Sequence, residues 1–251
     1  MNAAQLLVQI SDLHIGYPDG DPEGSLRVAV QEILKLEPAP AAVLISGDLT
    51  HNGLESEYRR LRELLAPLPM PIHPLMGNHD RREPFRQAFS DHAGVQSSPD
   101  EIRYVVDCAG LRLICLDTWL PGSDGGQLGE LQLAWLADQL AKGVATVVAL
   151  HHPPIPTGMD EFDRIGLPLS DREALARVLE PAPELVVSGH IHRAIQGRLG
   201  SVPVQICPSI FRQVELNLRP GGALRIVEGG TGMAIHIFRP GQPLLTHLHL
   251  F

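Results

Sequence analysis

Residues 6–14, which read LLVQISDLH, decide the fold class. Residues 6–11 are short and largely apolar, which predicts a buried β-strand that ends at Asp12-Leu13-His14. A loop rich in Gly, Pro and Asp follows over 16–24, and residues 25–36 then carry apolar side chains at helical spacing. Strand, loop and helix in this order are one unit of an α/β fold.

The same unit recurs up to residue 190, where the pattern changes. Further strands are predicted over 42–46, 72–76, 102–107, 111–117, 146–150 and 185–187, with 102–107 and 111–117 paired as a hairpin. Further helices are predicted over 54–65, from residue 81 to about residue 90, over 127–141 and over 171–179. The last has Ser170 as a candidate N-cap and Glu173 at the capping-box position. Only short β segments are expected later: 204–206, 214–218, 224–227, 233–238 and 244–248.

This alternation predicts a layered α/β fold with mixed sheets. We find no internal repeat and no low-complexity linker, so we expect one domain over residues 1–251. Its core would span residues 6–192, and a β-rich segment would follow from about 194 to 251. In such folds ligands gather at the carboxyl ends of strands.

Composition narrows the class of protein. The 251 residues include 20 Lys+Arg against 29 Asp+Glu, and a net charge of −9 argues against a protein that coats nucleic acid or anionic membrane. No apolar run approaches the roughly 20 residues of a membrane span, and no secretory signal is recognisable. Cys108, Cys115 and Cys207 are interpreted as reduced core residues, which predicts a cytoplasmic protein.

Residues able to bind metal follow five of the predicted strands. The motifs are Asp12-x-His14, Gly47-Asp48, Gly77-Asn78-His79-Asp80, His151-His152-Pro153 and Gly189-His190-x-His192. Carboxylate, imidazole and amide ligands without thiolate suit Fe, Mn, Zn or Co. The candidate ligands are too many for one ion and suit two, with Asp48 as the natural bridge; they are Asp12, His14, Asp48, Asn78, His151, His190 and His192.

These motifs, in this order, resemble those of the calcineurin-like metallophosphoesterases. The resemblance covers residues 6 to about 192, and within the family the chain looks most like bacterial class III cyclic nucleotide phosphodiesterases and their glycerophosphodiesterase relatives. Supporting stretches include Ser46-Gly47-Asp48-Leu49-Thr50 and Leu150-His151-His152-Pro153-Pro154. The resemblance implies an α/β/β/α sandwich of two mixed β-sheets flanked by helices.

The resemblance also implies roles for residues. Asp12, His14, Asp48 and His192 would hold one metal ion. Asp48, Asn78, His151 and His190 would hold the second. His79 would be the catalytic group that contacts the phosphate and assists proton transfer to the leaving oxygen.

Neighbouring residues keep competing interpretations. His151 rather than His152 matches the family's ligand, although the pair could be inverted. Asp80 and Asp117 are expected to orient histidines or to form turns.

Other segments are left open at this point. Arg81 and Arg82 are either phosphate clamps or, as we prefer, an exposed helix start. Residues 158–167 would form either a lid or a surface loop. His236, His247 and His249 fit the polar faces of surface strands better than another metal site.

The expected function is hydrolysis of a small phosphodiester by attack of a metal-bound hydroxide on phosphorus. A 3′,5′-cyclic nucleotide (cAMP or cGMP) is the first expectation and a glycerophosphodiester the second. A phosphomonoesterase is the nearest alternative, the charge of −9 disfavours a nuclease, and a catalytically inactive scaffold would be expected to lose ligands that are all present here. A homodimer or higher homo-oligomer is the family expectation.

Overall fold

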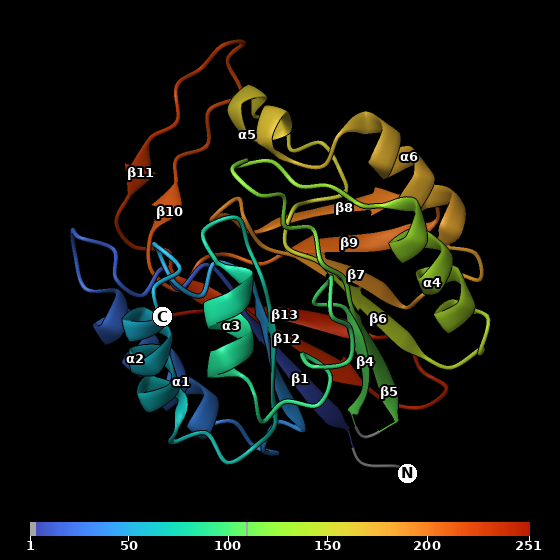
Figure 1. The fold of residues 1–251 in the computed structure, drawn as a ribbon, viewed down its shortest axis with the longest axis horizontal. Helices are drawn as coiled ribbons and strands as arrows, with labels where there is room; N and C mark the ends of the chain where they lie inside the picture. Colours follow the sequence, from blue (N-terminus) through green and yellow to red (C-terminus); the bar gives the residue numbers. More distant parts are fainter. Residues whose placement is uncertain (1–3, 109) are drawn as a thin grey trace.

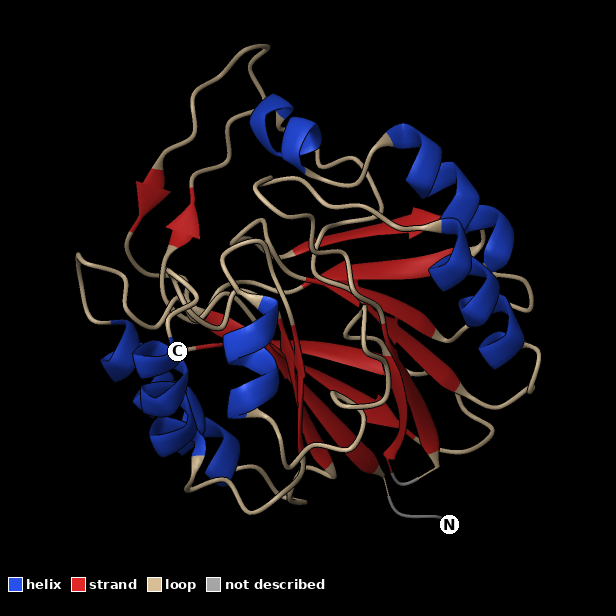
Figure 2. Ribbon diagram, viewed as in Figure 1, coloured by secondary structure: helices blue, strands red, loops and turns tan. Residues whose placement is uncertain are grey.

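The structure is a computed structural model that describes residues 4–108 and 110–251. Two mixed β-sheets pack against each other, and helices lie on both outer sides, as Figure 2 shows. The predicted α/β/β/α sandwich is therefore confirmed. No helix of the described residues combines the length and apolar character needed to cross a membrane.

The first sheet joins the beginning of the chain to its C-terminal segment. Its strand order is β13-β12-β1-β2-β3, in which β1, β2 and β3 are parallel and β12 and β13 antiparallel. The strands are β1 (Gln5–Ile10), β2 (Ala42–Ser46), β3 (Ile72–Leu75), β12 (Gly232–Phe238) and β13 (Leu245–Leu250). The helices that pack on this sheet are α1 (Pro22–Leu34), α2 (Glu55–Leu65) and α3 (Arg82–Ala88).

The second sheet has the order β4-β5-β6-β7-β9-β8 and is parallel from β5 to β9. Its strands are β4 (Tyr104–Cys108), β5 (Leu111–Cys115), β6 (Thr146–Ala149), β7 (Leu185–Ser188), β8 (Ile195–Leu199) and β9 (Val202–Ile206). Helices α4 (Glu130–Leu140) and α6 (Leu169–Val178) cover it. Outside both sheets lie α5 (Asp160–Ile165) and the pair β10 (Gln213–Val214) and β11 (Ile226–Val227), seen at the top left of Figure 1.

The central strands are apolar on both faces because each sheet is covered on both sides. Val8, Ile10, Val43 and Ile45 are fully buried between the helices and the second sheet. This explains why apolar residues follow one another in β1 and β2 instead of alternating with polar ones, with the buried Gln9 as an exception in β1.

Some local predictions were wrong. Helix α6 begins at Leu169 after Pro168, so Ser170 lies inside the helix and is not its N-cap. Strand β8 was not predicted, and β10 and β11 are shorter than expected. Residues 158–167 contain helix α5 rather than only a loop. The three cysteines are free and buried, as predicted.

The prediction that His236 lies on the polar face of a surface strand was also wrong, because its strand is not at the edge of the sheet. Strand β12 lies between β1 and β13, so His236 is fully buried instead of facing solvent. Its Nε2 lies 3.2 Å from Gln9 Oε1 and its Nδ1 2.9 Å from Thr246 Oγ1. His247 is exposed and His249 half-buried on the edge strand β13, which fits the surface interpretation for those two.

The packing of the sheets brings the carboxyl ends of four strands together. Gln9 on β1 donates from Nε2 to Ser46 Oγ on β2 at 2.8 Å and to the Ser188 carbonyl on β7 at 3.0 Å. The last of these bonds crosses from one sheet to the other. His151, which follows β6, donates from Nδ1 to the Ser46 carbonyl on β2 at 2.8 Å. The loops after β1, β2, β6 and β7 therefore meet at one edge of the sandwich.

Candidate metal centre

The loops after β1, β2 and β7 bring four candidate ligands into one cluster. One ligand atom from each of Asp12, His14, Asp48 and His192 lies within 4.8 Å of the others. His14 Nε2 is 3.0 Å from His192 Nε2 and 3.7 Å from Asp48 Oδ2. His192 Nε2 is 3.6 Å from Asp12 Oδ1. These are the residues that sequence analysis assigned to the first ion.

A second group forms around His151, at the end of β6. His151 Nε2 lies 3.5 Å from Asp48 Oδ2 and 3.2 Å from Asn78 Oδ1. His190 is packed beside it, with ring centroids 5.1 Å apart, and its buried Nε2 has no hydrogen-bond partner. Asp48 Oδ2 thus stands between the two groups, where a bridging ligand is expected.

Main-chain carbonyls fix the orientation of two of the ligand histidines. His151 Nδ1 donates to the Ser46 carbonyl at 2.8 Å, and His192 Nδ1 donates to the Arg212 carbonyl at 2.8 Å. A carbonyl oxygen can only accept, so Nδ1 carries the hydrogen and Nε2 is left with its lone pair. His151 Nε2 then faces a carboxylate and an amide oxygen with no donor among them, an arrangement that suits a cation.

The backbone is strained at the same residues. The described non-glycine residues with a left-handed φ are Asp12, His14, Asp48, His190 and His192, with φ between 48° and 72°. All five are candidate ligands. Such conformations cost free energy and concentrate at functional sites.

Glycines before the ligands allow the close approach of the loops. Gly47 has φ of 102°, and a Cβ at this position would collide with the His151 ring. A Cβ at Gly77 would collide with the Asp48 backbone and carboxylate. The Gly-Asp and Gly-Asn motifs are therefore steric requirements of the cluster.

Burial and neighbouring charges shift the pKa values of the cluster. Burial raises the pKa of Asp48, but the neighbouring His151 imidazole outweighs burial and holds this pKa well below its usual range. Burial lowers the pKa of His14 and of His190 well below 6.5, which keeps these rings neutral, as metal binding requires. Burial opposes a charge on His151 too, but the Asp48 carboxylate raises the pKa of His151 to about 9. A proton on His151 would occupy the place of a cation.

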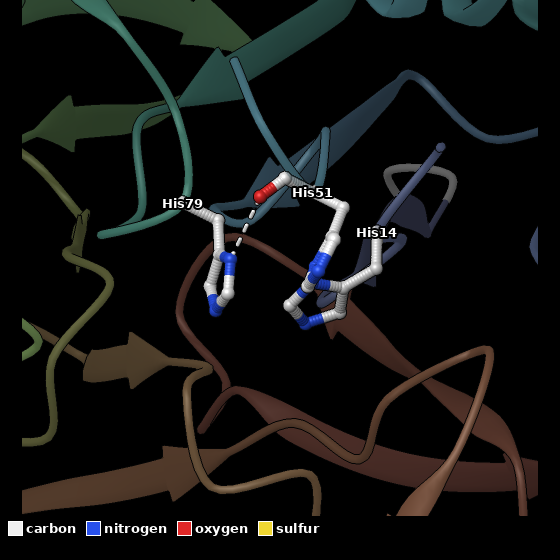
Figure 3. Close-up of side chains that lie close together, drawn as sticks. All are labelled: His14, His51 and His79. Atoms are coloured by element: carbon white, nitrogen blue, oxygen red, sulfur yellow. Dashed lines mark hydrogen bonds between the residues drawn. The ribbon is translucent and has the colours of Figure 1, made fainter. Parts of the chain in front are cut away.

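His79 lies close to the candidate ligand His14 and to His51, as Figure 3 shows. Its Nδ1 donates to the His51 carbonyl at 2.9 Å, which leaves Nε2 as the free ring nitrogen. The His51 ring stacks on the His79 ring with centroids 4.9 Å apart. His14, His51 and His79 also form a group whose ligand atoms lie within 4.8 Å of one another. His51 was missed, although it follows Asp48 in the same loop.

His152 differs from His151 in its partners. Its Nδ1 lies 2.8 Å from Thr118 Oγ1, and its Nε2 donates to the Asp124 carbonyl at 3.2 Å. Both ring nitrogens therefore have protein partners. His152 does have a ligand atom within 4.8 Å of those of His151 and His190, but its hydrogen bonds favour His151 as the ligand.

For Asp80 and Asp117 the turn interpretation is confirmed, and the expectation that they orient histidines is wrong. Asp80 accepts hydrogen bonds from the backbone of Leu49 and Thr50 and from Tyr58 Oη, so it holds the loop after β2. Asp117 accepts from the backbone of Ile102 and Trp119 and pairs with Arg82. Neither carboxylate bonds a histidine; carbonyl oxygens do that instead.

The two arginines at the start of α3 lie outside the cavity. Arg82 Nη2 lies 2.8 Å from Asp117 Oδ2, and Arg81 Nε donates to the Asn52 carbonyl at 3.0 Å. Neither residue lines the cavity, so the phosphate-clamp interpretation has no support. Among the described lining residues the one Arg or Lys is Arg212, which sequence analysis did not single out.

The ligand clusters lie at the bottom of a cavity of about 430 Å³. Its polar lining includes the candidate ligands His14, Asp48, Asn78, His190 and His192 together with His51, His79, Asp124 and Arg212. The rest of its wall is largely apolar and is formed by Tyr17, Phe162, Ile165, Phe211, Val214, Leu224 and Ile226. The residues present fit two metal ions, because carboxylate, amide and unpaired imidazole atoms converge without thiolate around the shared Asp48 oxygen.

Comparison with known proteins agrees with this arrangement. The chain is 32% identical to a cAMP/cGMP dual specificity phosphodiesterase of Mycobacterium tuberculosis, over 93% of this chain and 76% of the relative. It is 29% identical to a probable glycerophosphodiester phosphodiesterase of Arcobacter nitrofigilis, over 96% of this chain and 92% of the relative. Among solved structures, a purple acid phosphatase of yellow lupin matches all of this chain and 52% of its own, with 15% identity and a TM-score of 0.74. The model of the calcineurin-like phosphoesterase family matches residues 6–194, and the chain belongs to this family.

Proposed function

We propose that this protein is a metal-dependent phosphodiesterase that hydrolyses a small phosphodiester, with a 3′,5′-cyclic nucleotide as its preferred substrate. The observation that carries the proposal is the position of Asp48 Oδ2, 3.7 Å from His14 Nε2 and 3.5 Å from His151 Nε2. One carboxylate oxygen placed between two sets of ligands is the arrangement that two-metal phosphoryl transfer requires.

Two ions would be held by the chain's own side chains. We assign Asp12, His14, Asp48 and His192 to the first ion. We assign Asp48, Asn78, His151 and His190 to the second. Fe, Mn, Zn and Co all suit these ligands. When bound, such ions polarise the phosphoryl group and lower the pKa of water, so that hydroxide is available as the nucleophile near neutral pH.

His79 would deliver the proton that the leaving oxygen needs. Its Nδ1 is held by the His51 carbonyl, so Nε2 is the ring nitrogen available to the cavity. A proton on Nε2 can pass to an ester oxygen placed at hydrogen-bond distance. The stacked His51 ring keeps the plane of the imidazole fixed.

A glycerophosphodiester is the specific alternative to a cyclic nucleotide as the substrate. Relatives of comparable similarity are named for cyclic nucleotides and for glycerophosphodiesters. The apolar wall of the cavity favours the cyclic nucleotide, because glycerol offers little apolar surface to bury. We further propose a homodimer or higher homo-oligomer in the cytoplasm, with no nucleic-acid or membrane partner.

The test is an activity panel on purified protein loaded separately with each metal. Cyclic AMP, cyclic GMP, glycerophosphoethanolamine and an aryl monoester are compared by kcat/KM. We expect cyclic AMP or cyclic GMP to rank first. A monoester preferred over every diester would contradict the proposal, and so would a reloaded protein that binds metal but hydrolyses none of them.

A further inference from the structure

The cavity continues beyond the metal ligands into a compartment built by two segments far apart in the chain. One is helix α5, and the other is residues 213–228, which contain β10 and β11 and which we call the arm. Figure 1 shows the arm projecting beside α5. Phe162 and Ile165 of α5 and Leu224 and Ile226 of the arm line the cavity. None of these four side chains is a candidate metal ligand.

Two of these apolar side chains are partly open to solvent. Leu224 is 44% exposed and Ile226 is 50% exposed while both line the cavity. Water contact with aliphatic surface is unfavourable, and an apolar ligand group that covers it recovers free energy in proportion to the area buried. The wall therefore gains from an occupant with apolar surface.

The arm is fixed at both ends relative to the metal ligands. At its base, the Val214 N–H donates to the carbonyl of His192 at 3.1 Å. Near its tip, the Gly221 N–H donates to Asp160 Oδ2 on α5 at 2.8 Å. Because His192 is a candidate ligand, the apolar wall starts directly beside the place assigned to the phosphate.

Aromatic rings line another part of the same compartment. Tyr17 packs with Phe211 at a centroid distance of 5.5 Å, and the Arg212 guanidinium lies over both rings at 5.3 and 5.1 Å. Glu228 lies 2.9 Å from Arg212 Nε and offsets its charge. Ring faces and a flat guanidinium are surfaces on which planar groups stack.

We propose that this compartment binds a flat, largely apolar ring system attached to the phosphate, such as a nucleoside base, and that Ile226 and Leu224 set the preference for diesters that carry one. The inference rests on the proposed phosphodiesterase function and names the part of the substrate that selects it. A glycerol-sized polar group would leave most of the wall in water.

The arm offers a matched pair of variants for the test. Ile226 lines the cavity and is 50% exposed, whereas Leu216 on the same arm is 51% exposed and does not line it. Ile226→Ser and Leu216→Ser therefore make the same kind of change on the same segment. Each variant is assayed with cyclic AMP and with glycerophosphoethanolamine.

Ile226→Ser is expected to lower kcat/KM for cyclic AMP about tenfold, mainly through KM, because hydrophobic pocket contacts of this size discriminate to that extent. Glycerophosphoethanolamine hydrolysis should stay unchanged, and Leu216→Ser should change neither substrate. Equal losses on both substrates, no loss on cyclic AMP, or the same loss from Leu216→Ser would overturn the proposal.

A binding measurement separates this inference from the proposed function. Calorimetric titration of the wild-type protein and of Ile226→Ser compares 5′-AMP with glycerol 3-phosphate. We expect 5′-AMP to bind more tightly, and Ile226→Ser to weaken 5′-AMP alone. If the wild type hydrolyses no diester but shows this pattern, the proposed function fails and the compartment stands. Equal affinities for the two ligands would overturn the compartment, whatever the activity.

Discussion

The histidines of the strand-end loops and those of the packed interior use their ring nitrogens differently. His151 and His192 each donate from Nδ1 to a carbonyl and turn Nε2 toward other acceptors. His236 has a protein partner on both nitrogens, Gln9 and Thr246. A buried histidine with one nitrogen left among acceptors needs a cation, whereas one with two partners is complete. Burial alone does not distinguish a ligand histidine from an interior one, because His151 and His236 are both fully buried.

The largest effect is expected from the carboxylate that the loop histidines share. Asp48→Ala should reduce activity to background and lower the metal content at both sites, because Asp48 Oδ2 lies near His14 and His151 at once. Metal content is measured by mass spectrometry of the purified protein. Asp138→Ala, which removes an exposed carboxylate on α4, is the control. Retention of two ions per chain by Asp48→Ala would contradict the bridging role.

His79→Ala should separate catalysis from metal binding. The variant is expected to keep its metal and to lose about 10²–10⁴-fold in kcat, the usual contribution of a general acid or base. Kinetics and metal content are measured on the same preparation. Loss of metal together with rate would place His79 among the ligands and overturn its assignment as proton donor.

The interior histidine should behave in the opposite way. His236→Leu removes the imidazole that lies between side chains of β1 and β13. Gln9 Oε1 and Thr246 Oγ1 then lose their hydrogen-bond partner. We expect a loss of about 1–3 kcal/mol in the free energy of unfolding, the cost of leaving buried polar groups unpaired. Denaturant unfolding measures the loss, and the metal content per folded chain should not change. A fall in metal content would abolish the distinction between the two classes.

The smallest effect should come from two other histidines, His73 and His92, which contact each other. The Val95 N–H donates to His92 Nδ1, so His92 Nε2 must donate to His73 Nδ1, at 3.0 Å. Burial and the nearby His92 lower the pKa of His73 from 6.5 to about 4. The unfolded chain therefore binds the proton first, and this contribution to stability is lost as pH falls from 6.5 toward 4.

The comparison for this pair is between the wild type and His73→Phe. Urea midpoints are measured from pH 7 to pH 4. The wild type should lose more stability over this range than the variant, because the variant lacks one of the neutral rings that must be protonated. Parallel curves would show that the pair does not contribute.

The ligand cluster was predictable because parallel strands place their carboxyl ends at a common edge. When Asp48 or His190 follows an apolar strand, the strand pattern predicts where the residue lies, and the residue type indicates what it can bind. His51 could not be singled out, because its role depends on a ring that stacks from another loop. The burial of His236 depended on strand order, which a local pattern does not contain. The α5 half of the apolar wall lies in the segment 158–167, for which a lid was one of two interpretations. The arm meets α5 only through tertiary contacts, so its half of the wall could not be predicted from a local pattern.

The pairing of β1 with β12 has a consequence for how the chain is made. Gln5 lies opposite Phe238, so residue 238 must be synthesised before β1, the strand that Asp12 follows, is fully paired with its second neighbour. Until then the edge of an apolar strand stays open to other chains. The His192 ring also cannot adopt its final orientation until Arg212 has been synthesised, because the Arg212 carbonyl accepts its hydrogen bond. Assembly of the complete ligand site would therefore follow synthesis of residue 212, and full pairing of the β1 edge would follow synthesis of residue 238.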